Sequence, residues 1–286
     1  PYTLLRWLRM RDGDTGVSVF GSEHTRIWNS YVNNFGTFGL RVRQSAEVTL
    51  RQSVLWSNQV AVSSSAGGDV SARNNLVAAM RPGSVGLQRN NDALPTDFGF
   101  LDSNYNVLWS TNSAFVAELT GRQYPGQRRR FQFMINWQRD SGQDVFSLHA
   151  NPRLANLNAG DLHPQSPYGR YVSGVGYITN GLDVLSPLLD MGDPGLSFSL
   201  ETPPNGQRVD AGLYGNSTES SLSFTGGNLR VLTFNDGGAG SGLIELRWAA
   251  SGPALNHAVT LEFSSDGGST WTNIATNVAA FNQVYA

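Results

Sequence analysis

Apolar and polar residues alternate over short stretches near the N-terminus, as in Val17-Ser18-Val19 and Leu40-Arg41-Val42. A period of two residues predicts β-strands that turn one face inward. Three series of such segments recur about every 22 residues, each in a constant register with the others. The first series centres on Val17, Leu40 and Val60, the second on Ile27, Leu50 and Ala72, and the third begins at Tyr31, Val54 and Leu76.

Three series with one period indicate a single structural unit that stacks on itself, as in solenoid proteins. A repeat of this length with three short strands is typical of one coil of a parallel β-helix, in which the coil itself provides the crossover between parallel strands. No stretch keeps helical periodicity for three turns, and we expect one short helix, at Met134 to Arg139.

Amide side chains recur at the bend after the second strand of each repeat, at Asn29, Gln52 and Asn74. Stacked amides at a coil corner can hydrogen-bond to one another along the stack and to backbone groups of the turn. Asn is also common in turns for local reasons. Because these positions share the register of the apolar series, we favour a ladder of side-chain hydrogen bonds.

The pattern changes near Asn228, where alternating strands are separated by Gly-rich or Gly-Pro turns. Such regular hairpins are typical of a β-sandwich. The stretch holds only four or five strands, so we expect an incomplete module. The sequence therefore predicts an all-β protein, with a right-handed parallel β-helix over 1–226 and an immunoglobulin-like β-sandwich module over 227–286.

Composition narrows the possible chemistry. The 286 residues contain no Cys and no Lys, which excludes disulfides, thiolate metal sites, a Cys nucleophile and any Lys base. The formal net charge of −2 gives no general attraction to nucleic acid, and Arg128 to Arg130 form the one basic cluster, which we interpret as a solvated turn. No apolar run is long enough to span a membrane.

The segment from Asp140 to Ser220 contains Ala150-Asn151-Pro152-Arg153-Leu154, Ser186-Pro187-Leu188-Leu189-Asp190 and Asn205-Gly206-Gln207-Arg208-Val209-Asp210. This pattern resembles the closing section of large bacterial right-handed parallel β-helix proteins of the pectate-lyase-like superfamily. The resemblance covers roughly residues 1 to 226. It implies an extracellular or cell-surface protein, of which this chain is expected to be a part, and it is not specific for any activity.

Ser264 to Trp271 matches the Asp-box pattern, Ser-x-Asp-x-Gly-x-x-Trp, which is similar to hairpins of sialidase-like propellers and of bacterial immunoglobulin-like or fibronectin-like modules. We expect Asp266 to cap the hairpin turn and Trp271 to pack inward. The box is a folding device in either setting, and it says nothing about catalysis.

Carboxylates near Arg residues are the candidates for calcium and lyase chemistry. Asp12-Gly13-Asp14 places two oxygen donors on a turn, which either contribute to a calcium site or cap backbone amides. Calcium is the only cofactor that the sequence suggests. The further acidic candidates are Asp92, Asp97 and Asp102.

Trp28, Arg51 and Arg73 occupy equivalent positions at the end of the second strand of successive repeats. They are expected to line one outward face, which either holds an anionic glycan or is an ordinary polar surface. No catalytic residue can be assigned from the sequence, and no elbow, phosphate loop or dinucleotide motif is present.

The preferred interpretation is a non-catalytic structural or adhesive module of a large secreted or cell-surface protein. Its expected partners are a polysaccharide or other copies of itself in a filament or surface layer, with no nucleic acid and no transmembrane segment. The alternative is a polysaccharide lyase or glycoside hydrolase that uses a groove on the β-helix.

Overall fold

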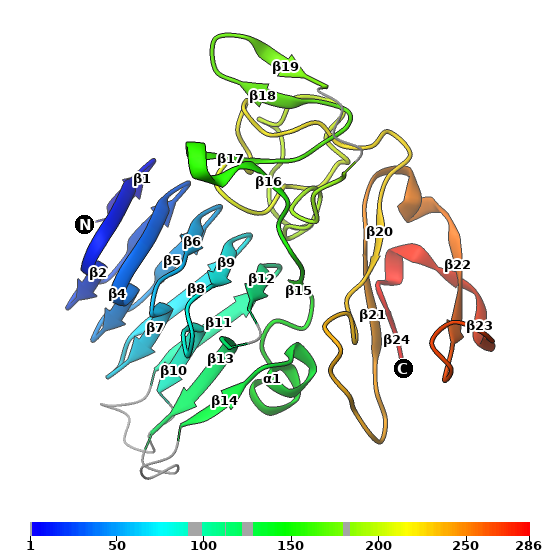
Figure 1. The fold of residues 1–286 in the computed structure, drawn as a ribbon, viewed down its shortest axis with the longest axis horizontal. Coiled ribbons are helices and arrows are strands. Elements are labelled where there is room, and N and C mark those ends of the chain that lie inside the picture. The colour runs from blue at the N-terminus through cyan, green and yellow to red at the C-terminus, as the bar shows by residue number, and fades with distance from the viewer. Residues whose placement is uncertain (1, 91–98, 112, 122–127, 180–183) are drawn as a thin grey trace.

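The computed structural model describes residues 2–90, 99–111, 113–121, 128–179 and 184–286 (Figure 1). Strands dominate these residues, which confirms the all-β class. The strands are β1 (Thr3–Arg6), β2 (Arg9–Phe20), β3 (Thr25–Trp28), β4 (Tyr31–Arg43), β5 (Val48–Arg51), β6 (Val54–Trp56), β7 (Val60–Ser65), β8 (Asp69–Arg73), β9 (Leu76–Ala79), β10 (Val85–Asn90), β11 (Phe100–Asn104), β12 (Val107–Ser110), β13 (Phe115–Thr120), β14 (Arg129–Phe131), β15 (Leu148–His149), β16 (Leu154–Asn156), β17 (Asp161–Pro164), β18 (Arg170–Val172), β19 (Gly176–Ile178), β20 (Leu229–Val231), β21 (Leu246–Ala250), β22 (Ala258–Phe263), β23 (Thr272–Ala279) and β24 (Val284–Tyr285).

One α-helix lies among the described residues, α1 at Met134–Ser141, close to the predicted position. Its 8 residues are far too few for a helix that crosses a membrane, and no other described helix is long enough. Three short 3-10 helices complete the elements: η1 (Leu157–Ala159), η2 (Gly252–Asn256) and η3 (Ala280–Asn282).

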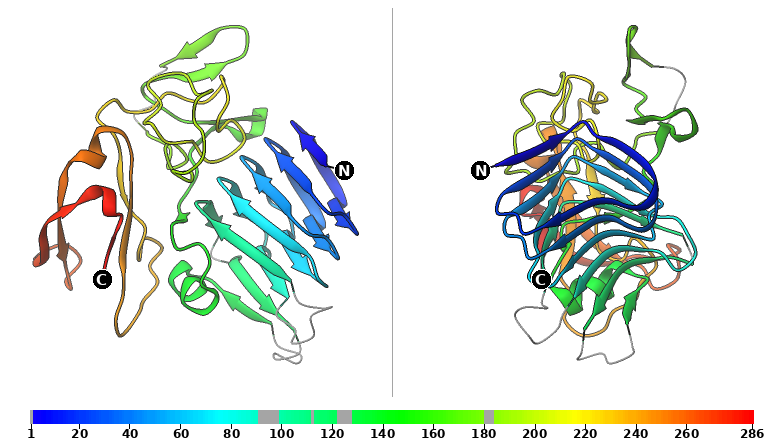
Figure 2. Two further views of the ribbon diagram at one scale, coloured as in Figure 1. Left: turned by 180° about the vertical axis from the view of Figure 1, so that it is seen from behind. Right: turned by 90° about the vertical axis from the view of Figure 1, so that its left-hand side faces the viewer.

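The predicted repeat appears as parallel strand pairing. A five-stranded sheet runs β1-β3-β5-β8-β11, and a ten-stranded curled sheet runs β14-β13-β10-β7-β4-β6-β9-β12-β15, with β2 beside β4. Every pair in these two sheets is parallel except β13 with β14. Viewed from the N-terminal side, successive repeats overlie one another (Figure 2).

The register confirms two of the three apolar series and corrects the other. Ile27 pairs with Leu50 and Leu50 with Ala72, and the Tyr31, Val54 and Leu76 series is likewise in register. In the first series Leu40 pairs with Val17 but also with Val62, while Val60 pairs with Phe38. Val60 and Val62 are both valines on the same face of β7, so the apolar pattern fits either of them opposite Leu40. The sequence pattern alone therefore leaves the register between β4 and β7 open by two residues.

The core between the sheets consists of aliphatic residues from the inward side of each strand, such as Leu40, Leu50 and Leu55. At the end of the stack, α1 and β14 cover this core with Phe131, Met134 and Trp137, all of them buried. The basic cluster is exposed, as predicted, but two of its three residues lie in a strand and not in a turn. Arg129 and Arg130 belong to β14 and form ion pairs with Asp140 and Glu118 respectively.

A ladder of side-chain hydrogen bonds does run along the stack, but one residue later than predicted. Ser30, Ser53, Asn75, Asn106 and Ser147 are all buried, and the backbone N–H of each of the first four donates to the side-chain oxygen of the next, at 2.9 to 3.1 Å. At the corner the backbone hydrogen bonds between neighbouring strands are interrupted, and these side chains accept the N–H groups in their place.

The predicted ladder residues Asn29, Gln52 and Asn74 all have positive φ at the corner. The amides of Asn29 and Asn74 contact a distant segment instead of one another. The amide nitrogen of Asn29 donates to the carbonyl of Leu213 at 2.9 Å, and the amide oxygen of Asn74 accepts the N–H of Asp193 at 2.7 Å.

An irregular segment, residues 186–217, packs against the outward side of β6, β9, β12 and β15. Val54, Leu76 and Val107 point outward and are fully buried beneath Leu188 and Met191. The neighbouring residues of the same strands are buried in the inner core, so these strands have apolar contacts on both faces. This double burial explains why β6 and β9 read as continuous apolar runs.

The C-terminal strands form a three-stranded sheet, β20-β21-β24, and a hairpin, β22-β23 (Figure 1). As predicted, Asp266 caps the hairpin turn, because it accepts hydrogen bonds from the N–H and hydroxyl of Thr270. The prediction for Trp271 was wrong: its side chain is 60% exposed and folds over the turn, where its indole N–H donates to Gly268.

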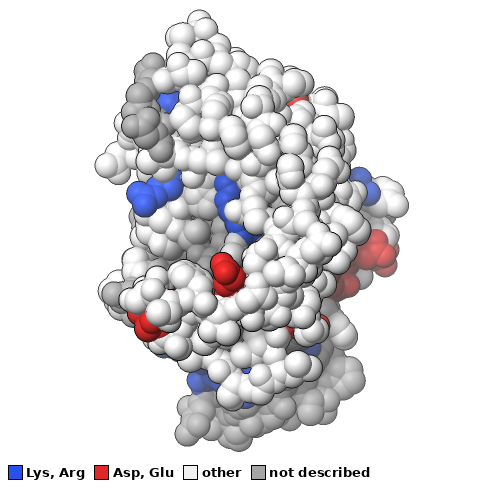
Figure 3. Space-filling view, turned by 90° about the vertical axis from the view of Figure 1, so that its right-hand side faces the viewer, with Lys and Arg blue, Asp and Glu red and all other residues white. Residues whose placement is uncertain are grey.

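In the view that faces β22 and β23, charged side chains are scattered (Figure 3).

Candidate functional site

The three predicted ligand-surface residues come together in one row. Trp28 ends β3, Arg51 ends β5 and Arg73 ends β8, and the three are direct neighbours in the parallel register, with Arg6 of β1 next to Trp28. Neighbouring strands are about 4.8 Å apart. The alternation of each strand turns the row outward while Ile27 and its equivalents enter the core, so the predicted common face is confirmed.

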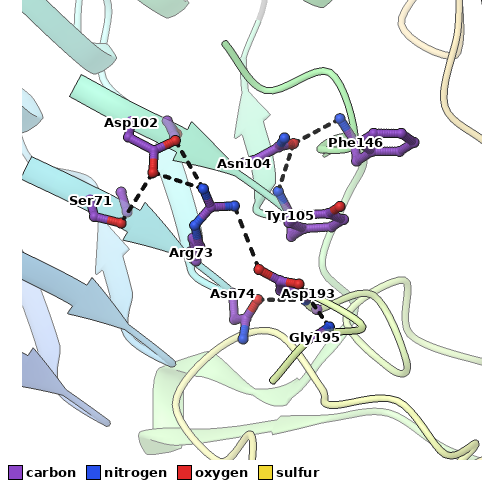
Figure 4. Close-up of polar contacts among 12 residues, drawn as sticks. Ser71, Arg73, Asn74, Asp102, Asn104, Tyr105, Phe146, Asp193 and Gly195 are labelled. Carbon is purple, nitrogen blue, oxygen red and sulfur yellow. Dashed lines mark hydrogen bonds and ion pairs between the residues drawn. The ribbon is translucent and has the colours of Figure 1, made fainter. Parts of the chain in front are cut away.

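Arg73 is engaged by acidic side chains. It forms an ion pair with Asp102 at 2.7 Å and a second with Asp193 at 3.5 Å, and its guanidinium lies 5.9 Å from the centre of the Tyr105 ring (Figure 4). Asp193 comes from the irregular segment, so Arg73 ties that segment to the sheet. Its charge is therefore neutralised by the fold itself.

Arg51 has no such partner. Within the part of the chain that the structure describes, its guanidinium forms no hydrogen bond or ion pair, and its Nε is buried without an acceptor. The guanidinium lies 6.0 Å from the centre of the Trp28 ring. Burial lowers the pKa of Arg51, with repulsion from Arg73 as the next cause, but an arginine stays protonated at neutral pH. Arg51 is thus a half-buried cation in need of an anion.

A cavity of about 270 Å³ opens directly over this cation. We name it the Trp28 pocket. One wall is the row on the sheet, and the other is the irregular segment with its apolar side chains Leu196 and Leu200 and the polar Ser197 and Asn216. Its lining residues are Arg6, Trp28, Asn29, Arg51, Gln52, Leu196, Ser197, Leu200, Gly215 and Asn216.

Buried carboxylates hold the irregular segment, which forms one side of the pocket, through hydrogen bonds to its backbone. The sequence did not predict them. The side-chain Oε1 of Glu201 accepts the N–H groups of Asp210 and Asn216 at 2.9 and 2.7 Å. Burial raises the pKa of Glu201 to about 8, and it also raises the pKa values of Asp210 and Asp190. All three carboxyls are buried in the fold and do not line the pocket. Their Gly-rich surroundings in the sequence are typical of turns and give no sign of burial.

The calcium candidates lie elsewhere. Asp12 and Asp14 sit at a bend within β2, where Asp12 has a φ of 59°, and they accept hydrogen bonds from Asn34 and Thr37 of β4. Among the described residues no group of three or more acidic or histidine side chains could hold a metal ion. Calcium at this bend therefore stays a prediction.

The other acidic candidates are accounted for as far as the structure describes them. Asp102 binds Arg73, and Asp92 and Asp97 lie outside the described residues.

The chemistry that this arrangement offers is recognition of an anion beside a flat apolar surface. A guanidinium matches a carboxylate in a two-point hydrogen bond, and a Trp ring offers a face against which a sugar ring can pack. Both carboxylates that approach the row, Asp102 and Asp193, already bind Arg73.

Comparison with protein-family models, with curated protein sequences and with solved structures finds no match for this chain. The resemblance to pectate-lyase-like proteins therefore remains a prediction, and conclusions about function depend on the geometry of the site.

Proposed function

We propose that this chain is a rigid, non-catalytic module of a secreted or cell-surface protein that binds an acidic polysaccharide in the Trp28 pocket. The observation that carries the proposal is the unpaired guanidinium of Arg51 beside the Trp28 ring. A half-buried charge without a counter-ion costs free energy, and a uronate carboxylate would offset that cost.

The fold we propose with this function is a right-handed parallel β-helix followed by a β-sandwich module. Its support is the parallel register that links every repeat from β1 to β12. Each layer adds backbone hydrogen bonds and a buried apolar layer, which makes such a stack a stiff scaffold. A stiff scaffold suits an adhesive or spacer role, because it holds the pocket at a fixed distance from whatever anchors the protein.

Acidic sugars fit the Trp28 pocket better than a free inorganic anion does. The pocket combines the unpaired Arg51, and Arg6, which hydrogen-bonds to the Asn29 amide, with an aromatic ring and with Leu196 and Leu200, so part of the ligand must be apolar. A uronic acid residue combines a carboxylate with an apolar ring face. Polysaccharide binding through single sugar contacts is weak for one site, and repeated presentation along a chain strengthens it by avidity.

The test is calorimetric titration with hexasaccharides of galacturonate and of mannuronate, each compared with its neutral counterpart. We expect an acidic hexasaccharide to bind and its neutral counterpart not to bind. Replacement Arg51→Gln should weaken binding at least tenfold, since a hydrogen-bonded charge pair is worth about 1.5–3 kcal/mol. The matched control is Arg139→Gln on α1, an exposed arginine away from the pocket.

Two outcomes would overturn the proposal: no binding of any acidic hexasaccharide at millimolar concentration, or equal affinity in the Arg51→Gln variant. Unsaturated or reducing ends that accumulate during incubation would replace the binding function by a lyase or hydrolase. Concentration-dependent growth of particles without any glycan would favour self-assembly instead.

A further inference from the structure

A second row of outward side chains runs along the neighbouring face of the stack. Arg11 of β2, Asn33 of β4, Trp56 of β6, Ala78 of β9 and Trp109 of β12 are successive neighbours in the parallel register. This row is separate from the row of Trp28 and Arg51. The chain turns a corner after β3 and β5, which carry Trp28 and Arg51, and the second row lies on the strands that follow this corner.

The two tryptophans of this row form a pair over a small residue. Trp56 and Trp109 lie two strands apart with Ala78 between them, and their ring centres are 5.6 Å apart with the planes tilted by 58°. Ala78 is fully buried beneath them. A larger side chain at this position would separate the rings. Both rings remain partly exposed, so they form an open aromatic platform.

The indole nitrogens of this pair are unused. Among the described residues, neither Trp56 nor Trp109 donates its indole N–H to any acceptor, whereas four other tryptophans do. The indole N–H groups of Trp28, Trp137, Trp248 and Trp271 donate to Thr49, Asp144, Ala280 and Gly268 respectively. A tryptophan that combines apolar contact area with a free donor is suited to a ligand that has both an apolar face and hydroxyl groups.

A wall from a distant part of the chain faces the platform. Residues 151–154, Leu157 and Gln165 enclose with the two tryptophans a cavity of about 280 Å³. Asn151, Arg153 and Gln165 supply polar groups to it, and Leu154 supplies an apolar one. Leu157 also lines a second cavity, of about 540 Å³, which continues toward Arg11, Tyr31 and Asn33. The two cavities are thus neighbours that share Leu157 along the row, and we call the pair the groove.

We propose that the platform part of this groove binds a neutral polysaccharide, with one sugar ring on the Trp56–Trp109 platform. Among the described residues Arg153 is the only charged one that lines the platform cavity, and it lies on the exposed rim, whereas Arg9 and Arg11 line the second cavity. The walls otherwise offer amides, free indole donors and apolar side chains. At the platform this combination matches the hydroxyl groups and ring faces of uncharged sugars.

The inference is independent of the acidic-sugar pocket. The Trp28 pocket and the groove share no lining residue. If both sites bind, the module links an acidic and a neutral polysaccharide across one corner of the stack. If only one of the two sites binds its sugar, the proposal for the other site is refuted and the proposal for the binding site stands.

The test follows the indole N–H resonances of the unmodified protein by NMR, with 15N-labelled tryptophan, during titration. The probes are neutral hexasaccharides of β-1,4-linked glucose, mannose and xylose and of α-1,4-linked glucose. We expect at least one of them to shift the resonances of Trp56 and Trp109 and to leave those of Trp137 and Trp248 in place. Trp56→Ala and Trp109→Ala should each weaken binding about tenfold.

Two control variants separate this groove from other surfaces. Trp271→Ala removes a more exposed tryptophan on the β22–β23 turn, and Arg51→Gln removes the cation of the other site; neither should change the affinity for the neutral probe. The proposal is overturned if no neutral hexasaccharide moves the Trp56 and Trp109 resonances at millimolar concentration. It is equally overturned if binding occurs with those two resonances unmoved, since the ligand would then occupy another surface.

Discussion

The carboxylate of Asp144 accepts the indole N–H of Trp137 at 2.9 Å at the end of the stack. Both side chains are fully buried, and the second carboxylate oxygen accepts the hydroxyls of Ser103 and Ser147 at 2.9 and 2.7 Å. Burial raises the pKa of Asp144, and these hydrogen bonds oppose the rise. One side chain thus joins α1, which closes the core, to the last turns of the stack.

We predict that Asp144→Ala destabilises the protein by about 2–4 kcal/mol, because four side-chain donors, those of Trp137, Ser103, Ser147 and Asn106, lose their acceptor together. The measurement is the free energy of unfolding in urea. Glu23→Gln, at an exposed position, is the control and should stay within about 0.5 kcal/mol of the unaltered chain. A loss below 0.5 kcal/mol for Asp144→Ala would show that α1 is held by apolar contacts alone.

The ladder at the corner predicts a specific rescue. The side chain of Asn75 accepts the N–H of Ser53 at 3.0 Å and donates to the carbonyl of Leu50 at 3.0 Å. Asn75→Ala should cost about 1–3 kcal/mol, because it leaves buried backbone groups unpaired.

Asn75→Ser should recover part of this loss, since Ser30 and Ser53 fill the equivalent positions of earlier repeats. Urea unfolding of the two variants decides the matter. If Ser proves no better than Ala, the ladder contributes through side-chain volume and not through hydrogen bonds.

Packing of the irregular segment predicts a large loss at Leu188. This side chain is 1% exposed and contributes to the core outside β6 and β9. Leu188→Ala should destabilise the protein by about 2–5 kcal/mol, the usual cost of a buried leucine truncated to alanine. Leu200→Ala, which truncates a side chain that is 51% exposed in the same segment, should be nearly neutral.

Amide hydrogen exchange of residues 186–217 should rise in the Leu188→Ala variant and stay unchanged in the control. Equal stability of the two variants would mean that the segment is not packed as described.

Buried Glu201 predicts a stability that falls as the pH rises. Its pKa is raised from 4.5 to about 8 by burial, so the folded protein keeps a proton that the unfolded chain releases above pH 4.5. The stabilisation by the neutral carboxyl is complete below pH 4.5 and is lost as the pH rises to about 8. Each pKa unit corresponds to about 1.4 kcal/mol, so the loss should reach a few kcal/mol.

The measurement is urea unfolding between pH 5 and 8.5, for the unaltered chain and for Glu201→Gln. Glu201→Gln should have a flatter profile, and the difference between the two profiles removes the contribution of other groups, such as His163, whose pKa is lowered by burial. Glu262→Gln, on the exposed side of β22, is the control. Parallel profiles for Glu201→Gln and the unaltered chain would refute the prediction.

Much of the strand pattern follows from local sequence. Alternation with a period of two fixes which side chains of a strand share a face, and the recurring apolar residues fix which strands are neighbours, as Ile27, Leu50 and Ala72 show. The same reasoning places Trp28, Arg51 and Arg73 in one outward row. Where two apolar residues compete for a position, as at Val60 and Val62, the pattern leaves the register open by two residues.

Whether an outward residue is buried, paired or exposed depends on contacts between distant parts of the chain. Arg51 and Arg73 are equivalent in the sequence, yet among the described residues Asp193 forms an ion pair only with Arg73, because the irregular segment returns to the sheet beside that residue. The same return buries Val54 and Leu76 on the outward side.

The sequence by itself thus determined the repeat, the strands and the common face of the row. Only the tertiary structure decided which cation on that face stays without a partner, because the position of a segment far along the chain is set by its packing and leaves no periodic signal in the sequence.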